Sequence, residues 1–210
     1  MPGEFIPLAE ETGLIVPLGE WILRTACAEA AKWPAHLRIA INLSPAQFRS
    51  KELVPVIIDA LASSEVAPHR LELEVTETVI MHDSEAVFEA LGQLRELGVR
   101  IALDDFGTGY SSLSFLQKFP FDKIKIDRSF VNELSSARAE AHHLARAVVR
   151  FAVSLGKTTT AEGVETKEQL DILCEEGCLE TQGYYFSRPV PASDIARILR
   201  RGAGAAVRAA

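Results

Sequence analysis

The sequence has few of the features that mark secreted, membrane-spanning or disulfide-stabilised proteins. It contains only three cysteines in 210 residues, which is too few for a disulfide scaffold. No apolar run approaches the roughly 20 residues needed to span a bilayer. The first residues also lack the basic segment and apolar stretch of a signal peptide. We therefore expect a soluble protein of the reducing cytoplasm.

Basic residues are in the minority as well. There are 22 Lys and Arg against 29 Asp and Glu, so the formal net charge is −7. This balance argues against a nucleic-acid coat or an anionic membrane surface as the main partner. It does not exclude a phosphate substrate, because bound metal ions can reverse the local electrostatic field. With 48% hydrophobic and 24% charged residues, the composition is that of an ordinary globular domain.

Short apolar runs alternate along the chain with longer amphipathic segments. The runs expected to be strands are 38–44, 71–77, 100–107, 123–129, 158–165 and 179–187. The segments expected to be helices are 5–13, 17–33, 51–64, 84–97, 130–155, 166–176 and 192–201. No linker divides residues 1–201, which we take as one domain. Residues 202–210 form an Ala/Gly-rich tail that is expected to fray.

Six strands separated by helices predict parallel βαβ units, in either an open doubly wound sheet or a barrel. In the fourth strand, isoleucines occupy one face, whereas Lys123, Lys125 and Asp127 occupy the other. An open sheet covered by helices on both sides would be apolar on both faces. A TIM-type (β/α) barrel has a polar mouth at the carboxyl ends of its strands. The sequence therefore favours an α/β barrel, incomplete because about six of the eight strands are present.

Polar side chains recur at the carboxyl ends of all six predicted strands. They are Asn42, Glu74, Asp104, Asp105, Lys125, Asp127, Glu162, Glu165 and Gln182. Converging carboxylates repel one another, and divalent cations remove that cost. Oxygen ligands favour Mg²⁺, Mn²⁺ or Ca²⁺ over zinc, and the adjacent pair Asp104 and Asp105 suits two metals. Two-metal sites hydrolyse phosphodiesters, and Lys125 would supply positive charge beside the reacting phosphate.

Seven segments of the chain, in order and at matching spacings, resemble the EAL-domain cyclic di-GMP phosphodiesterases. They are FIPLAEETGLI, INLSPAQF, LELEVTET, ALDDFGTGYSSL, IKIDRSFV, TAEGVET and TQGYYFSRPVP. The resemblance runs from residue 2 to about residue 195. It implies hydrolysis of the bacterial second messenger cyclic di-GMP to linear pGpG, with Mg²⁺ or Mn²⁺ as the cofactor.

The resemblance also implies roles for individual residues. Those implied as metal ligands are Asn42, Glu74, Asp104, Asp105 and Glu162. Those implied as catalytic are Lys125, Glu162 and Gln182, the last as a partner of the metals or their water. Glu77 and Glu165, with which we group Asp127, resemble acids that hold the DFGTGYSS loop. In this family that loop closes over the metals and contributes to a homodimer.

The sequence departs from the family at its beginning. Neither the Glu-Ala-Leu motif that names the family nor E-x-L-x-R occurs upstream of residue 42. Family domains carry that motif on the second of two initial strands, so one metal ligand and a phosphate-gripping arginine are expected to be missing. The segments 38–44 and 179–187 would then be free sheet edges. We expect such a chain to be marginally stable, to associate through these edges and to hydrolyse cyclic di-GMP weakly.

Two other functions stay open at the level of the sequence. One is a catalytically inactive EAL-like module that binds cyclic di-GMP or a protein partner. The other is an unrelated Mg²⁺ barrel enzyme of the aldolase or enolase type. The retained candidate ligands favour an active enzyme. Tyr184, Tyr185 and Phe186 are equally compatible with a core strand and with an aromatic face beside a guanine base.

Overall fold

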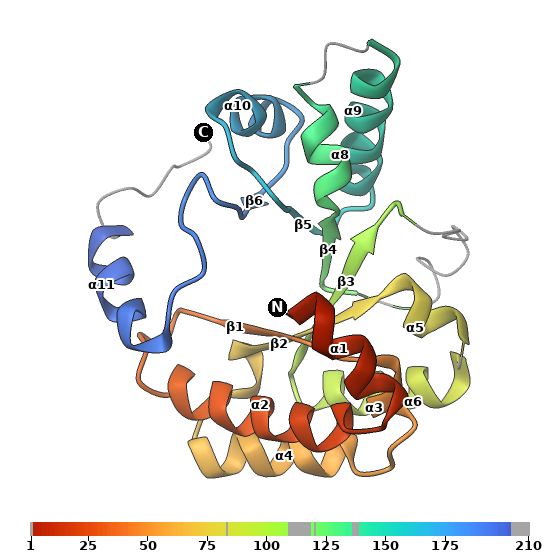
Figure 1. Ribbon diagram of the computed structural model, residues 1–210, viewed down its shortest axis with the longest axis vertical. Helices are drawn as coiled ribbons and strands as arrows, with labels where there is room; N and C mark the ends of the chain where they lie inside the picture. The colour runs from red at the N-terminus through yellow and green to blue at the C-terminus, as the bar shows by residue number, and fades with distance from the viewer. Residues whose placement is uncertain (1, 83, 109–118, 120, 136–138, 203–210) are drawn as a thin grey trace. The chain divides into compact units, whose positions relative to one another are not determined.

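The computed structural model describes residues 2–82, 84–108, 119, 121–135 and 139–202 (Figure 1). Six strands of this part of the chain form one sheet in the order β1-β2-β3-β4-β5-β6. The described residues divide into two compact units. The first contains those up to residue 103 together with Phe119 and Phe121, and the second contains residues 104–108 and those from residue 122 onward. The α/β class and the six strands of an incomplete TIM-type barrel are as the sequence predicts.

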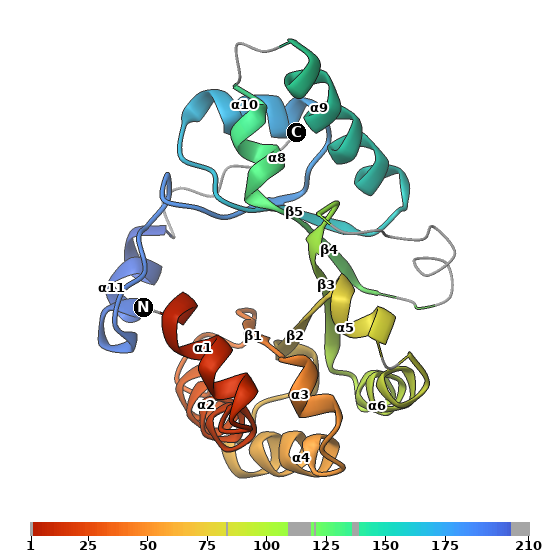
Figure 2. The same ribbon diagram turned by 45° about the vertical axis from the view of Figure 1, so that its right-hand side comes forward.

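The first unit contains two parallel strands, the start of a third, and the helices connected to them. Its elements are α1 (Pro2–Glu11), α2 (Ile15–Ala30), β1 (Ile39–Asn42), α3 (Pro45–Phe48), α4 (Leu53–Ser64), the 3₁₀ helix η1 (Pro68–Arg70), β2 (Leu71–Thr76), α5 (Glu77–His82), α6 (Ser84–Glu96) and the first residues of β3 (Arg100–Phe106). Strands β1 and β2 are parallel, with Ile39 opposite Leu71 and Asn42 opposite Glu74. Helices α2 and α4 lie side by side (Figures 1 and 2).

A buried arginine ties the end of α2 to the start of β2. The side chain of Arg70 donates from Nη2 to the carbonyl of Ala30 at 2.8 Å and from Nε to that of Leu37 at 2.8 Å. The last carbonyls of a helix have no partner inside the helix and carry its negative dipole end. The guanidinium satisfies one of them and its own donors, so a charged side chain can be buried at this junction.

The second unit holds the remaining strands and their helices. Its elements are the end of β3, β4 (Lys123–Ile126), α8 (Arg128–Glu133), α9 (Ala139–Ser154), β5 (Thr158–Ala161), α10 (Lys167–Glu175), β6 (Glu180–Thr181) and α11 (Ala192–Gly202). Strands β4, β5 and β6 are parallel, and Lys125 lies opposite Thr160, which lies opposite Glu180. Ile124 and Ile126 are fully buried, and α9 packs against β4.

Several predicted elements differ in extent from the observed ones. The strand predicted over 158–165 ends at Ala161, and the strand predicted over 123–129 ends at Ile126. The helix predicted over 130–155 is two helices, because α8 begins at Arg128 and ends at Glu133, and α9 begins at Ala139. Asp127 starts α8 early as its N-cap, since its carboxylate accepts the Ser129 N–H at 3.0 Å. This also ends the preceding strand at Ile126.

The strand predicted over 179–187 is only Glu180–Thr181. The chain turns at Gly183, where a Cβ would lie 2.2 Å from the carbonyl oxygen of Val164. Only glycine permits this approach, and it directs the following aromatic residues away from the sheet. The predicted tail, apart from Gly202, and residues 109–112 of the DFGTGYSS loop lie outside the described residues.

A buried carboxylate joins α10 to α9 within the second unit. Glu176, at the carboxyl end of α10, accepts hydrogen bonds from both Arg150 and Arg146 of α9. Its side chain is only 4% exposed. The hydrogen bond from Arg150 and then that from Arg146 hold the pKa of Glu176 below its usual value, and they outweigh the opposing effect of burial.

We expect Glu176→Gln to lower the free energy of unfolding at pH 7 by about 1–3 kcal/mol, because charge-assisted hydrogen bonds are lost at a buried site. A carboxylate whose pKa is lowered in the folded state contributes its full stabilisation above the ordinary pKa of glutamate, about 4.3, and this contribution is lost as the pH falls further. Between about pH 5 and about pH 3, the free energy of unfolding of the variant should therefore fall less than that of the wild type. Urea unfolding across this range measures both effects, with Glu175→Gln, on an exposed neighbour, as the control. Equal stability of Glu176→Gln and the control would contradict the role of the pair.

Candidate active site

The centre of the site in the second unit is a buried ammonium between two carboxylates. The Nζ atom of Lys125, on β4, lies 3.0 Å from Oδ1 of Asp104, on β3, and 2.6 Å from Oε1 of Glu162, just after β5. The Lys125 side chain is 4% exposed and that of Asp104 is 10% exposed. Charges buried to this degree must be paired. The three strand ends are therefore linked through one lysine.

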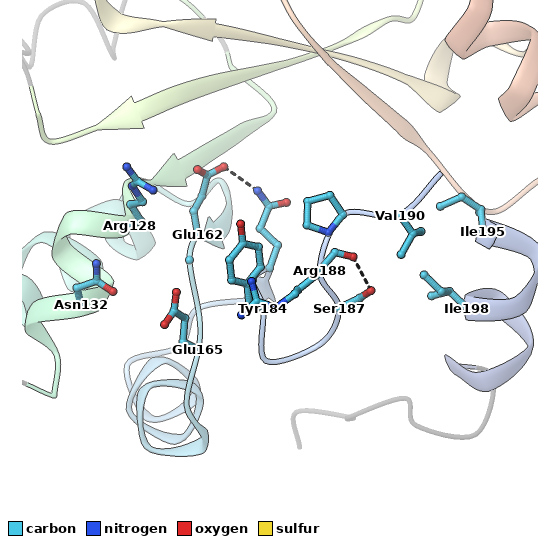
Figure 3. A pocket seen from close by; sticks show the side chains of 14 residues that line it. Arg128, Asn132, Glu162, Glu165, Tyr184, Ser187, Arg188, Val190, Ile195 and Ile198 are labelled. Carbon is cyan, nitrogen blue, oxygen red and sulfur yellow. Dashed lines mark hydrogen bonds between the residues drawn. The ribbon is translucent and has the colours of Figure 1, made fainter. Parts of the chain in front are cut away.

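Glu162 also contacts Gln182, which follows β6 and which the sequence predicts as a site residue. Gln182 donates from Nε2 to Oε1 of Glu162 at 2.8 Å (Figure 3). Each of these residues comes directly after a strand and is held there by a backbone hydrogen bond to the neighbouring strand. The Glu162 N–H donates to the Ile126 carbonyl at 3.1 Å, and the Gln182 N–H donates to the Ala161 carbonyl at 2.9 Å. The structure thus brings together Asp104, Lys125, Glu162 and Gln182, as the sequence predicts.

Asp105 lies in a backbone conformation that is uncommon for residues other than glycine. Its φ angle is +54°, in the left-handed region, and its N–H donates to Oδ1 of Asp104 at 3.0 Å. Such conformations cost free energy and occur mainly where the surrounding structure imposes them, often at functional sites.

The first unit holds three further candidates. Asn42 and Glu74 are opposite each other at the carboxyl ends of β1 and β2. The next residue after Asn42, Leu43, donates its N–H to the Glu74 carbonyl at 2.9 Å, which extends the pairing by one residue. The side chain of Glu74 is buried, whereas Asn42 is exposed. Glu77 is buried at the first position of α5.

A pocket of about 600 Å³ opens beside Glu162 and Gln182 in the second unit (Figure 3). Its lining also includes Glu165, Tyr184 and Arg188. Sequence analysis proposed Glu165 and left Tyr184 undecided, but it missed Arg188. The signal available for Arg188 was the short segment SRPVP directly after three aromatic residues, which places a cation near the last strand end.

Arg128 and Asn132 line the same pocket and were also missed. Both lie on α8, which begins at Arg128 rather than in the predicted strand. Asp127, which the sequence groups with the acids that hold the DFGTGYSS loop, instead caps this helix through Ser129. The missed signal was the Asp-x-Ser spacing, which is typical of a helix start.

The donor atoms of the site are the kind that bind hard divalent cations. Asp104 and Glu162 share the single ammonium of Lys125, so two carboxylates face one positive charge. The excess of carboxylate oxygen suits Mg²⁺ or Mn²⁺. Among the described residues, no group of three or more His, Cys, Asp or Glu side chains is already arranged around a common metal position. The chemistry of these donors fits a divalent metal ion.

These observations define a class: an α/β barrel domain whose strand ends carry acids, an amide and one buried lysine. The EAL domain family matches residues 1–189, and the chain belongs to this family. The predicted family is therefore confirmed. In the described part of the chain, we find no helix with the length and apolarity needed to cross a membrane.

The chain is 45% identical over 202 residues to the bifunctional diguanylate cyclase/cyclic di-GMP phosphodiesterase MucR of Pseudomonas aeruginosa, which is 92% of this chain and 29% of MucR. A structure of the MucR phosphodiesterase in complex with c-di-GMP matches with a TM-score of 0.87 and 43% identity, covering 93% of this chain and 80% of that one.

Solved structures of BlrP1 from Klebsiella pneumoniae contain metals. Its manganese/c-di-GMP complex matches with a TM-score of 0.74 and 35% identity, covering 83% of this chain and 44% of that one. A calcium/c-di-GMP complex of BlrP1 matches with a TM-score of 0.73. The curated relatives are much longer than this chain, which spans 29% of MucR.

We expect Lys125→Met to lower the free energy of unfolding, measured without divalent ions, by about 3–5 kcal/mol, because it leaves Asp104 and Glu162 without their shared ammonium. Lys167→Met is the matched control, since Lys167 also pairs with a carboxylate, Asp171, but is 70% exposed. Its effect should stay below about 1 kcal/mol. Denaturant unfolding in EDTA measures both variants. Similar losses for the two lysines would show that Lys125 is not the central counter-ion.

Proposed function

We propose that this domain hydrolyses one phosphodiester bond of cyclic di-GMP to give linear pGpG, with Mg²⁺ or Mn²⁺. The observation that carries this proposal is the buried Lys125 held between Asp104 and Glu162 at adjoining strand ends. It places fixed positive charge among oxygen donors, which is what a reacting phosphodiester requires. The c-di-GMP complex of the similar MucR phosphodiesterase supports the choice of substrate.

The residues that would hold the metals are Asn42, Glu74, Asp104, Asp105 and Glu162. Bound there, the ions would lower the pKa of a water molecule and neutralise charge on the phosphate. The chain's own groups would do the remaining work. Lys125 would stabilise the negative charge that develops on the phosphate oxygens, because a positioned ammonium acts most strongly in a site that excludes water.

Glu162 and Gln182 would orient the attacking water. Their hydrogen bond of 2.8 Å fixes the amide, which then presents a carbonyl oxygen as an acceptor near the same carboxylate. Glu165, in the same pocket, and the buried Glu77 would support the adjoining loop. A homodimer formed through the DFGTGYSS region or the strand edges belongs to this proposal, and light scattering tests it.

Incubation of the chain with cyclic di-GMP and Mn²⁺, followed by chromatographic separation of nucleotides, tests the reaction. Formation of pGpG that stops when EDTA is added supports the proposal. Tight binding without any product would instead favour the alternative of an inactive cyclic di-GMP-binding module. Absence of both binding and product would overturn the proposed substrate.

In any form of the domain that turns over, we expect Glu162→Gln and Lys125→Ala each to lower the rate by at least about 100-fold, because a metal ligand or a preorganised charge is lost. Glu168→Gln makes the same change on the exposed first turn of α10 and should keep the rate. Circular dichroism checks that each variant is folded. Rates near wild type in folded Glu162→Gln would remove this residue from the mechanism.

We expect Ca²⁺ to compete with Mn²⁺ and suppress turnover, because Ca²⁺ accepts the same oxygen ligands with a larger and looser coordination. The measurement is the initial rate at constant Mn²⁺ and rising Ca²⁺, with binding of cyclic di-GMP followed in parallel. Binding should persist while the rate falls. Equal turnover with Ca²⁺ and Mg²⁺ as sole ions would count against two closely spaced metals.

A further inference from the structure

The last strand of the described sheet is short, yet a residue of the candidate active site follows it directly. Strand β6 consists of Glu180 and Thr181, and Gln182 is the next residue. Among the described strands, β6 has one neighbour in the sheet, β5. A slip of one residue in the register of a strand turns each side chain to the opposite face. The register of β6 therefore decides whether Gln182 can reach Glu162.

The side chain of Glu180 ties β6 to two other strands. Its Oε2 atom lies 2.6 Å from Nζ of Lys123, on β4, and accepts a hydrogen bond from Oγ1 of Thr160, on β5, at 3.0 Å. The Lys123 side chain is 9% exposed, so its ammonium needs a counter-charge close by. Because β5 separates β4 from β6 in the sheet, this ion pair reaches across a whole strand.

This ion pair lies one level below the contacts of the candidate active site. Lys125 and Gln182 each come two residues after Lys123 and Glu180, and side chains two apart on a strand share a face. At the upper level, Glu162 is bonded to Lys125 at 2.6 Å and to Gln182 at 2.8 Å. Both levels thus connect a lysine of β4 to a polar side chain at β6. The lower contact fixes the register at which the upper contact is made.

We propose that Glu180 is a positioning residue that, through Lys123 and Thr160, holds β6 in the register at which Gln182 meets Glu162. Among the described residues that line the pocket beside Glu162, Glu180 is absent, so it acts through Gln182 and has no contact with the reacting phosphate. The proposal rests on the proposed function for the role of Gln182 in orienting water. It adds a residue that sets the position of this amide from below.

A double-mutant cycle on a form of the domain that turns over cyclic di-GMP with Mn²⁺ separates positioning from general stability. We expect Glu180→Ala to lower kcat by about 10-fold, because small displacements of a positioned group reduce the rate strongly. The KM should stay within about twofold, since the loss falls on the reacting complex. In Gln182→Ala, where the amide is already missing, the same change should lower kcat by less than about twofold.

The side-chain amide of Gln182 gives a second readout, which needs neither metal nor turnover. Nitrogen-15 NMR in EDTA follows its resonances, which are assigned by their loss in Gln182→Ala. We expect hydrogen exchange of this amide to be at least about 10-fold faster in Glu180→Ala, because its contact with Glu162 opens more often. Lys123→Met removes the same ion pair from its other side and should have the same effect.

Asp171→Ala is the matched control, since it removes the carboxylate of an exposed ion pair, that with Lys167 on α10. It should leave kcat and the Gln182 amide unchanged. Circular dichroism and melting temperatures check that each variant is folded. If Glu180→Ala does not fold, Glu180→Gln takes its place in both measurements, because it keeps the size of the side chain and removes its charge.

Equal losses of kcat with and without the Gln182 side chain would show that Glu180 has only a general structural role, and would overturn the proposal. An unchanged Gln182 amide in the folded Glu180 variant would overturn it as well. If no form of the domain produces pGpG, faster exchange of this amide in the Glu180 and Lys123 variants would uphold the positioning role and reject only the proposed hydrolysis.

Discussion

A buried ammonium needs counter-charges within hydrogen-bonding distance, and Lys125 imposes this condition on three strand ends at once. Asp104 comes from β3 and Glu162 follows β5, so their positions relative to β4 are set by contacts of 3.0 and 2.6 Å to one nitrogen atom. The pairing is unequal, because two carboxylates share one positive charge. Under the proposed function, a bound divalent cation would offset this imbalance.

A second lysine of β4 is also paired with a carboxylate in the second unit. Lys123 is two residues before Lys125 and points to the same side of β4, since side chains alternate along a strand. Its Nζ lies 2.6 Å from Oε2 of Glu180, which also accepts from Thr160 at 3.0 Å. The inner face of these strands is therefore polar in successive layers, whereas Ile124 and Ile126 on the other face are buried. In a (β/α) barrel the apolar outer face lies under the helices, and polar residues gather at the mouth formed by the carboxyl ends of the strands.

Turns just beyond the strands convert this polar face into a site. At Gly163, with φ of +71°, a Cβ would lie 2.6 Å from Cβ of Arg128, so only glycine lets the chain leave β5 beside α8. Gly183 does the same after β6, against Val164. These two approaches place Glu162, Gln182 and Tyr184 around one pocket. Loops after strands are the usual place for function on this type of scaffold.

Much of the fold could be predicted from the sequence because its signals are local. Alternation of apolar and charged residues predicted strands β2 and β4, a short apolar run predicted β3, and amphipathic segments predicted α2, α4 and α6. The residues Asp104, Lys125, Glu162 and Gln182 could be chosen because each is a polar residue that the sequence pattern assigns to the polar end of a predicted strand. The break between α8 and α9 and the short β6 were missed, since a cap at Asp127 and a close approach at Gly183 compete with the periodic pattern.

The sequence by itself determined the class of fold, the family and the chemical types present at the strand ends, because these depend on residue order and spacing. Only the tertiary structure decided which groups touch: that one lysine serves two carboxylates, that Gln182 donates to Glu162, and that Arg188 lies over Tyr184. Such contacts join residues up to tens of positions apart. Their distances follow from strand register and from turns that allow close backbone approach, and no local pattern encodes either.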